Sequence, residues 1–322
     1  MKRDYNIEIL RILAMLGVRL CHTLFAGVGH RMFGVSEWLG GLAGASVDVF
    51  VFISGWYGIR FKVGKLVALY ATAVFCVIES RLAMKAFGYA PAAGSIIGDI
   101  SFNYWFLHAY AALMCIAPII ESAFENGKSV LKMAIPFLVF VFGWGWMWTR
   151  FVIWKLPFPS VHGMESHSWV TLVGVYVAAR LCRIYEVDRF LSRITCIVGV
   201  VVCAAVAGFH YGILNGYNCV AVLAMTIFMF SFFRKLRIEG AFVAKFCTFV
   251  VPSLFAVYLL HQSPFGRMVV AQVGGLRGNV PIPNALCGLM FAILVFVCSF
   301  IADMPRRLLV VLWHRTKMKF RV

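Results

Sequence analysis

Charged residues are scarce in this chain. Asp, Glu, Lys and Arg make up 13% of its 322 residues and hydrophobic residues make up 62%, whereas a soluble domain is about 25% charged. The roughly 200 apolar residues are enough for about ten membrane-spanning helices of roughly 20 residues each. The other residues average roughly 11 per loop or tail, which excludes a separate soluble domain. The sequence therefore predicts an all-α, polytopic membrane helix bundle that forms one domain over residues 1–322.

Metal and redox motifs are also missing. The ten cysteines form no CxxC pair and no Cys/His spacing typical of a metal site. All ten lie in or beside apolar runs, where we expect small buried thiols rather than disulfides or ligands. No metal is predicted. The first apolar run ends without a small-residue cleavage site, so we expect it to be a retained span.

Ten apolar runs are predicted to span the membrane. In chain order they cover residues 7–27, 40–59, 66–87, 102–120, 130–149, 168–185, 194–211, 213–233, 243–262 and 284–304. A further stretch, 306–313, is predicted to prolong the last helix along the inner membrane surface.

Acidic residues are few, at 13 against 30 Lys and Arg, which gives a net charge of +17. On a soluble protein this excess would indicate a nucleic-acid partner, but cytoplasmic loops of membrane proteins also collect Lys and Arg. With the N-terminus inside, about 21 of the 30 basic residues lie in predicted cytoplasmic segments and about six in outer loops. We therefore expect both termini in the cytoplasm, a lipid bilayer as surroundings and no nucleic acid as partner.

Several ionisable residues lie inside the predicted spans, where a charge is costly and often marks a functional site. They are Glu8, Arg11, Arg19, His22, Asp48, Glu79, Arg81, His108, His261 and Asp303. Considered singly, each has a structural alternative, since a histidine in a span more often bonds a neighbouring helix than performs catalysis. Together they predict a His/carboxylate layer toward the outside and a basic layer toward the cytoplasm.

Arg11 and His22 are 11 residues apart. This spacing amounts to about three helical turns plus about 20°, so both side chains project from one helix face, about 16 Å apart along the axis. Arg19 and His22 are neighbours on the same helix, and a nearby positive charge favours the neutral imidazole. The pattern predicts a groove with a fixed cation at one end and a base at the other.

Four segments, in order, resemble the membrane acyltransferase-3 family. They are the first span with its Arg11 and His22, Val47 to Trp56 (VDVFVFISGW), Asn103 to Tyr110 (NYWFLHAY) and Val257 to His261 (VYLLH). The resemblance implies an O-acyltransferase of the bacterial inner membrane. It would move an acyl group, usually acetyl from acetyl-CoA, to a hydroxyl of a cell-envelope carbohydrate, either a surface polysaccharide or a glycolipid.

The resemblance also implies residue roles. His22 would be the catalytic base or a transient acyl carrier, with Arg11 and Asp48 in the catalytic group. Arg11, Arg60 and Lys62 would bind the acyl-CoA. The residues expected to contact substrate are Arg19, Glu79, Trp105, His108 and His261. Arg19 stands where the family usually has an apolar residue, so it would tune His22 or indicate a changed donor.

A transporter or flippase for a small solute or glycolipid is the alternative interpretation, in which the intramembrane charges line a path. Such proteins often contain internal repeats and helices broken by Gly or Pro, and the sequence shows neither clearly. A structural scaffold gives no reason for so many buried charges.

Overall fold

A computed structural model describes residues 3–25, 35–90, 94–126, 128–144, 167–209, 218–276 and 284–319. Over these ranges the chain forms helices and no strands, which confirms the all-α prediction. The helices are α1 (Tyr5–Phe25), α2 (Val35–Gly44), α3 (Ser46–Tyr57), α4 (Val63–Ala86), α5 (Ile96–Asn103), α6 (Trp105–Asn126), α7 (Lys128–Leu138), the π-helical η1 (Val139–Trp144), α9 (Trp169–Ile184), α10 (Val187–Phe190), α11 (Arg193–Phe209), α12 (Val220–Arg234), α13 (Ala241–Val250), the 3-10 helix η2 (Val251–Ser253), α14 (Leu254–Gln262), α15 (Pro264–Leu276), α16 (Asn284–Ala302) and α17 (Met304–Lys319).

Five helical runs are long and apolar enough to cross a membrane: Trp38–Tyr57, Val63–Ala86, Trp105–Glu125, Ala241–Gln262 and Leu286–Trp313. They correspond to the second, third, fourth, ninth and tenth predicted spans, so a multi-pass membrane protein is supported. The count of ten spans and the orientation of the termini stay predictions.

The other predicted spans differ from these five in length or charge. The first corresponds to α1, which has 21 residues but includes Glu8, Arg11 and Arg19. The sixth, seventh and eighth correspond to α9, α11 and α12, which have 16, 17 and 15 residues and are shorter than the roughly 20 that a bilayer requires. Helix α12, in the eighth predicted span, begins at Val220, and residues 213–217 of that span lie outside the described residues. The fifth predicted span, 130–149, lies partly outside the described residues.

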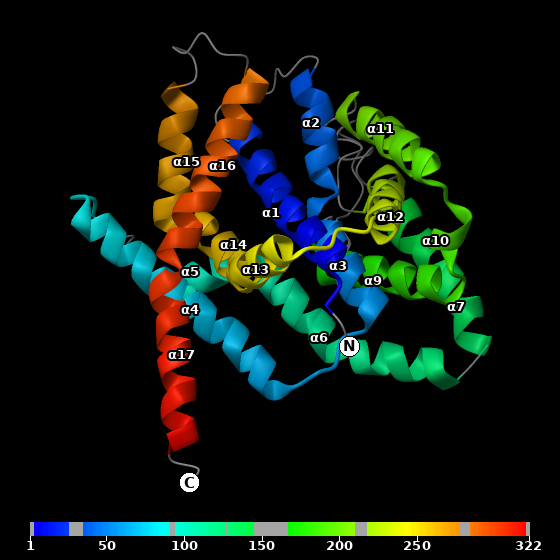
Figure 1. Cartoon of the computed structure of the whole chain (residues 1–322), viewed down its shortest axis with the longest axis horizontal. Coiled ribbons are helices and arrows are strands. Elements are labelled where there is room, and N and C mark those ends of the chain that lie inside the picture. Colours follow the sequence, from blue (N-terminus) through cyan, green and yellow to red (C-terminus); the bar gives the residue numbers. More distant parts are fainter. Residues whose placement is uncertain are drawn as a thin grey trace, which may run out of the picture.

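Helix α1 runs through the middle of the bundle (Figure 1). It packs against α2, α3 and α12 on one side and against α13, α14 and α16 on another. Buried residues of α1 such as Leu10 and Ala14, at 0% and 1% exposed, belong to the main hydrophobic core. Helix α1 is therefore held in place by several neighbouring helices. Helix α17 continues α16 in nearly the same direction (Figure 1).

Two local breaks place the functional segments. Gly58 ends α3 with a φ of 79°, a left-handed conformation that glycine adopts without a Cβ clash, and the chain turns there into the segment carrying Arg60. Pro252 lies in η2, the 3-10 turn between α13 and α14, where its missing N–H interrupts the α-helical hydrogen bonding. Helix α14 follows this turn within the same helical run, and its last residues, His261 and Gln262, lie beside His22 of α1.

Candidate active site

A cavity of about 330 Å³, the central cavity, lies against α1. Its walls are Arg11, Met15, Val18, Val47, Phe50, Ser54, Leu69, Phe106, Tyr110, Val251, Leu254, Phe255 and Tyr258. His22 follows Val18 by one turn on the same face of α1. The ring of Tyr258 lies 5.6 Å from the ring of His261. The wall of the central cavity on α1 therefore runs from Arg11 to Val18 and includes neither His22 nor His261, which lie just beyond Val18 and Tyr258.

A second cavity of about 440 Å³, the basic cavity, adjoins the central cavity. Four residues line both: Arg11, Ser54, Leu69 and Tyr110. The basic cavity is also lined by Arg60 and Lys65, whereas the exposed Lys62 is not among its walls. The two cavities together form a path with cations at one end and histidines near the other.

Arg11 stands where the two cavities meet. Its Nη1 lies 3.2 Å from Oε2 of Glu8. Glu8 is 7% exposed, and its other oxygen, Oε1, lies 3.6 Å from Nε of Arg3. The Arg11 side chain is 32% exposed, so the ion pair orients the guanidinium without enclosing it. Arg11 therefore retains N–H groups for a ligand in the path.

The loop that carries Arg60 is anchored from α9 and α6. The backbone N–H of Ile59 donates to the hydroxyl of Tyr176 at 3.0 Å, and that hydroxyl donates to Glu121 at 2.5 Å. Glu121 also forms a 2.9 Å ion pair with Arg180. This series of contacts fixes the base of the loop and so positions its cation at the cavity.

His22 and His261 come together through Gln262. The side-chain nitrogen of Gln262 lies 2.7 Å from Nε2 of His22 and 3.1 Å from Nε2 of His261, and the two imidazole centroids are 5.0 Å apart. His261 is 2% exposed and His22 is half-buried. The first and ninth predicted spans therefore meet at these histidines, as a common site requires.

Arg19 is 1% exposed and turned toward α14 and α16. Its Nη2 donates to the carbonyl of Val257 at 3.1 Å and to Oγ of Ser299 at 2.6 Å. Its Nε and Nη1 have no hydrogen-bond partner among the described residues. Arg19 therefore binds the helix that carries His261 and lines neither the central nor the basic cavity.

Asp48 is fully buried, and its two oxygens have no hydrogen-bond partner within the described ranges. On α3, the residues Val47, Phe50 and Ser54 line the central cavity, and Asp48 does not. The structure therefore does not bring Asp48 together with Arg11 and His22. Its predicted place in the catalytic group stays a prediction, and we give it no step.

Ser54 faces the path, but its hydroxyl is occupied. It donates to the carbonyl of Phe50 at 2.9 Å, so the hydroxyl of Tyr110, 3.1 Å away, is left to donate to Ser54 Oγ. A serine nucleophile assisted by Asp48 is not favoured by this arrangement, because Asp48 does not line the cavity that Ser54 faces.

His108 and Trp105, two of the predicted substrate contacts, line neither the central nor the basic cavity. Nε2 of His108 lies 3.2 Å from the carbonyl of Ile100 and Nδ1 lies 3.1 Å from the hydroxyl of Tyr70, so both its ring nitrogens are engaged. Trp105 packs edge-on against His167 with centroids 4.8 Å apart, while Phe106 and Tyr110 supply the cavity wall.

Glu79 lines a third cavity, of about 220 Å³, between α4, α14, α15 and α16. His261 also lines it, and Oε2 of Glu79 has no hydrogen-bond partner in the described part of the chain. Most of the other walls are apolar, including Leu260 and Leu294. Of the two histidines, only His261 shares this cavity with Glu79, and His22 is not among its walls.

Functional residues that the sequence did not predict include Lys65, Tyr110 and Tyr258 in the cavity walls and Gln262 between the two histidines. Gln262 directly follows His261 in the sequence, and a polar residue beside a histidine inside an apolar run was the available signal. The contact with His22 depends on how α14 packs against α1, which no spacing within one segment reveals.

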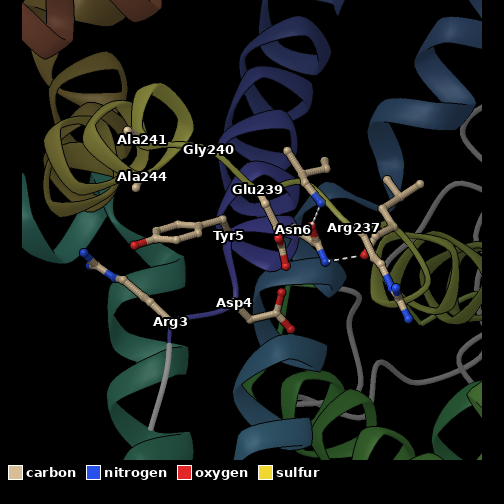
Figure 2. Close-up of a pocket in the computed structure, with 11 residues that line it drawn as sticks. Arg3, Asp4, Tyr5, Asn6, Arg237, Glu239, Gly240, Ala241 and Ala244 are labelled. Atoms are coloured by element: carbon tan, nitrogen blue, oxygen red, sulfur yellow. Dashed lines mark hydrogen bonds between the residues drawn. The ribbon is translucent and has the colours of Figure 1, made fainter.

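A larger surface cavity, of about 570 Å³, lies at the start of α1. Asn6 donates to the carbonyl of Leu236 at 2.6 Å and accepts from the N–H of Ile238 at 2.8 Å (Figure 2). Arg3 and Arg237 line this cavity together with Asp4 and Glu239 (Figure 2). It shares no wall residue with the central or the basic cavity, so its size alone does not make it the reaction site.

Comparison with known protein families identifies the family of this chain. A family model described as an acyltransferase domain matches residues 4–303, a range that includes Arg11, His22 and Gln262. No curated protein and no solved structure matches the chain. Because the matched range covers most of the 322 residues, the chain belongs to the acyltransferase-3 family that its four sequence segments resemble.

Proposed function

We propose that this acyltransferase is an O-acetyltransferase type enzyme of the bacterial inner membrane. It takes an acyl group, most simply acetyl, from cytoplasmic acyl-CoA and passes it to a hydroxyl of a cell-envelope carbohydrate, either a surface polysaccharide or a glycolipid. The observation that carries the proposal is the path formed by the basic and central cavities, which leads from Arg60 and Lys65 past Arg11 to Val18. His22 lies one helical turn beyond Val18 on the same face of α1.

The donor fits this path by charge and shape. Acyl-CoA carries its phosphates at one end and its thioester at the end of a narrow arm. Arg60 and Lys65 would bind the phosphates, since cations at a cavity mouth attract anions, and the exposed Lys62 adds charge nearby. The arm would pass Arg11 and place the thioester toward His22, about 16 Å further along α1.

The reaction needs a base beside the incoming hydroxyl. As base, His22 takes the proton from the acceptor hydroxyl while its oxygen attacks the thioester carbonyl. The carbon–sulfur bond breaks, and the proton passes from His22 to the departing CoA sulfur. As acyl carrier, the His22 imidazole attacks the thioester first, releases CoA and then transfers the acyl group to the hydroxyl.

Acyl transfer in membrane vesicles tests the proposal. Vesicles containing the protein receive acetyl-CoA labelled in the acetyl group and an envelope glycan or glycolipid fraction. We expect label on the carbohydrate, and label on His22 in the absence of acceptor if the residue is an acyl carrier. If unlabelled glycolipid or solute crosses the membrane and no acetyl group is transferred, the transporter alternative replaces the enzyme.

The basic cavity is tested in the same assay. Replacing both Arg60 and Lys65 with Ala is expected to raise KM for acetyl-CoA with little change in kcat, because these residues contact the donor far from the reacting carbonyl. Lys132→Ala is a matched control, since Lys132 is an exposed cation on α7 outside both cavities. Equal KM values in both variants would contradict the donor site.

A further inference from the structure

The amide of Gln262 touches both histidines and is itself 7% exposed. We propose that Gln262 is a positioning residue that holds Nε2 of His22 as the atom with the free electron pair, ready to accept a proton or an acyl group. The proposal rests on the proposed function for its chemical meaning. The hydrogen bonds that support it do not depend on which reaction the protein catalyses.

The direction of each hydrogen bond follows from the carbonyl of Val257. A carbonyl only accepts, so Nδ1 of His261, 3.4 Å away, carries the donated proton. In a neutral imidazole the other nitrogen then has the electron pair, and Nε2 of His261 accepts from the amide nitrogen of Gln262. The second N–H of that amide remains for Nε2 of His22, which therefore also accepts.

Arg19 holds the carbonyl of Val257, at which this series of hydrogen bonds begins. Its Nη2 donates to the same Val257 carbonyl to which His261 donates, and to Ser299 on α16. Arg19 thereby holds the carbonyl that sets the tautomer of His261. Arg19, the residue that departs from the family pattern, thus reaches His22 through Val257, His261 and Gln262.

An amide suits both protonation states of His22. When Nε2 takes up a proton it becomes a donor, and a half-turn of the Gln262 amide presents its oxygen to His22 while giving up the hydrogen bond from the amide nitrogen to His261. Glu at this position has only acceptor oxygens when ionised, and Met has no comparable donor. These two substitutions therefore separate the functions of the amide with little change in side-chain volume.

Kinetics of the full-length protein in vesicles give the first test. For Gln262→Met we expect kcat to fall about tenfold or more, because His22 loses its orientation, while KM for acetyl-CoA stays unchanged. For Gln262→Glu we expect the acidic limb of the pH–rate profile to move to higher pH, because a carboxylate stabilises the protonated imidazole. Gln272→Met is the matched control, since Gln272 is exposed on α15 and donates to Tyr89 at 3.1 Å.

Chemical modification gives a second test that needs no acyl transfer. Diethyl pyrocarbonate attacks the unprotonated nitrogen of an imidazole, and mass spectrometry locates the adduct at His22. We expect modification about fivefold faster in Gln262→Met, the factor that corresponds to releasing one ordinary hydrogen bond, and slower in Gln262→Glu at the same pH. Gln272→Met should react as the wild type does.

The outcomes separate the two proposals. If His22 is modified at the wild-type rate in both Gln262 variants, or if the pH profile of Gln262→Glu is unshifted, the positioning role is wrong even when acyl transfer is robust. If the modification rates change as expected but wild-type vesicles transfer no acyl group, the proposed function fails while the assignment of Gln262 to His22 is upheld.

Discussion

At the scale of residues, the α1 pattern predicted a shared helix face for Arg11 and His22. In the structure, Arg11 and Val18 line the central cavity and His22 follows on the same face. The spacing of 11 residues was informative because, on one regular helix, the number of residues between two positions fixes the angle between their side chains. Arg19 was different, since sequence adjacency suggested an effect on His22 and the side chain instead bonds Val257 and Ser299. Its partners lie 238 and 280 residues away.

Arg11 is the residue whose loss should affect donor binding most clearly. We expect Arg11→Ala to raise KM for acetyl-CoA roughly 10- to 100-fold, since a hydrogen bond to a charged group contributes about 1.5–3 kcal/mol. The measurement is KM and kcat in vesicles over a range of donor concentration.

Glu8 provides the control for this change, because Arg11→Ala also removes its 3.2 Å ion-pair partner. The double variant Arg11→Ala, Glu8→Gln removes the buried carboxylate that has lost its nearer ion-pair partner, and it should recover stability in detergent without recovering KM. A KM that returns to the wild-type value in the double variant would show that Arg11 acts on the fold and not on the donor.

At the scale of elements, apolar runs predicted most helices, but not their lengths or their crossings. Apolar composition identifies a buried or lipid-facing segment, whereas helix ends depend on local breaks such as Gly58 and Pro252. The close crossing of α3 and α9 depends on Gly55. A β-carbon built there would lie 2.7 Å from the carbonyl oxygen of Tyr176 and 2.8 Å from Cβ of Ala179.

Gly55→Ala should therefore force α3 and α9 apart. We expect a loss of about 1–3 kcal/mol in stability, the usual cost of overpacking, together with reduced acyl transfer because Arg60 and Ser54 move with α3. Thermal unfolding in detergent measures the first effect. Gly64→Ala is the matched control, because nothing lies within 4 Å of a β-carbon built at Gly64; equal melting temperatures for the two variants would contradict the packing account.

At the scale of the whole molecule, composition predicted an all-helical membrane protein in one bundle. Five runs have the length and apolarity of membrane spans. The histidine pair could not be predicted as a contact, because the hydrogen bond that links it joins Gln262 to His22, 240 residues apart in the chain. Positions of charged residues along the sequence indicate sidedness, but only packing between helices decides which charges share a cavity.

The bias of basic residues predicts that both ends of the chain lie in the cytoplasm. Tags at the N-terminus and the C-terminus should both resist protease in intact spheroplasts and both be cleaved in inside-out vesicles. Digestion of either tag in intact spheroplasts would overturn the orientation and, with it, the cytoplasmic side assigned to the donor.

The composition of envelope carbohydrate in cells that carry His22→Ala is the most direct test of the central claim. Mass spectrometry and NMR of the purified glycan identify the acceptor hydroxyl and the acyl group together, and immunoblotting of membranes measures the amount of protein. We predict that wild-type cells carry an O-acyl group which is lost in His22→Ala cells, although the variant is present in membranes at the wild-type level. Unchanged acylation in His22→Ala cells would contradict the proposed role of His22.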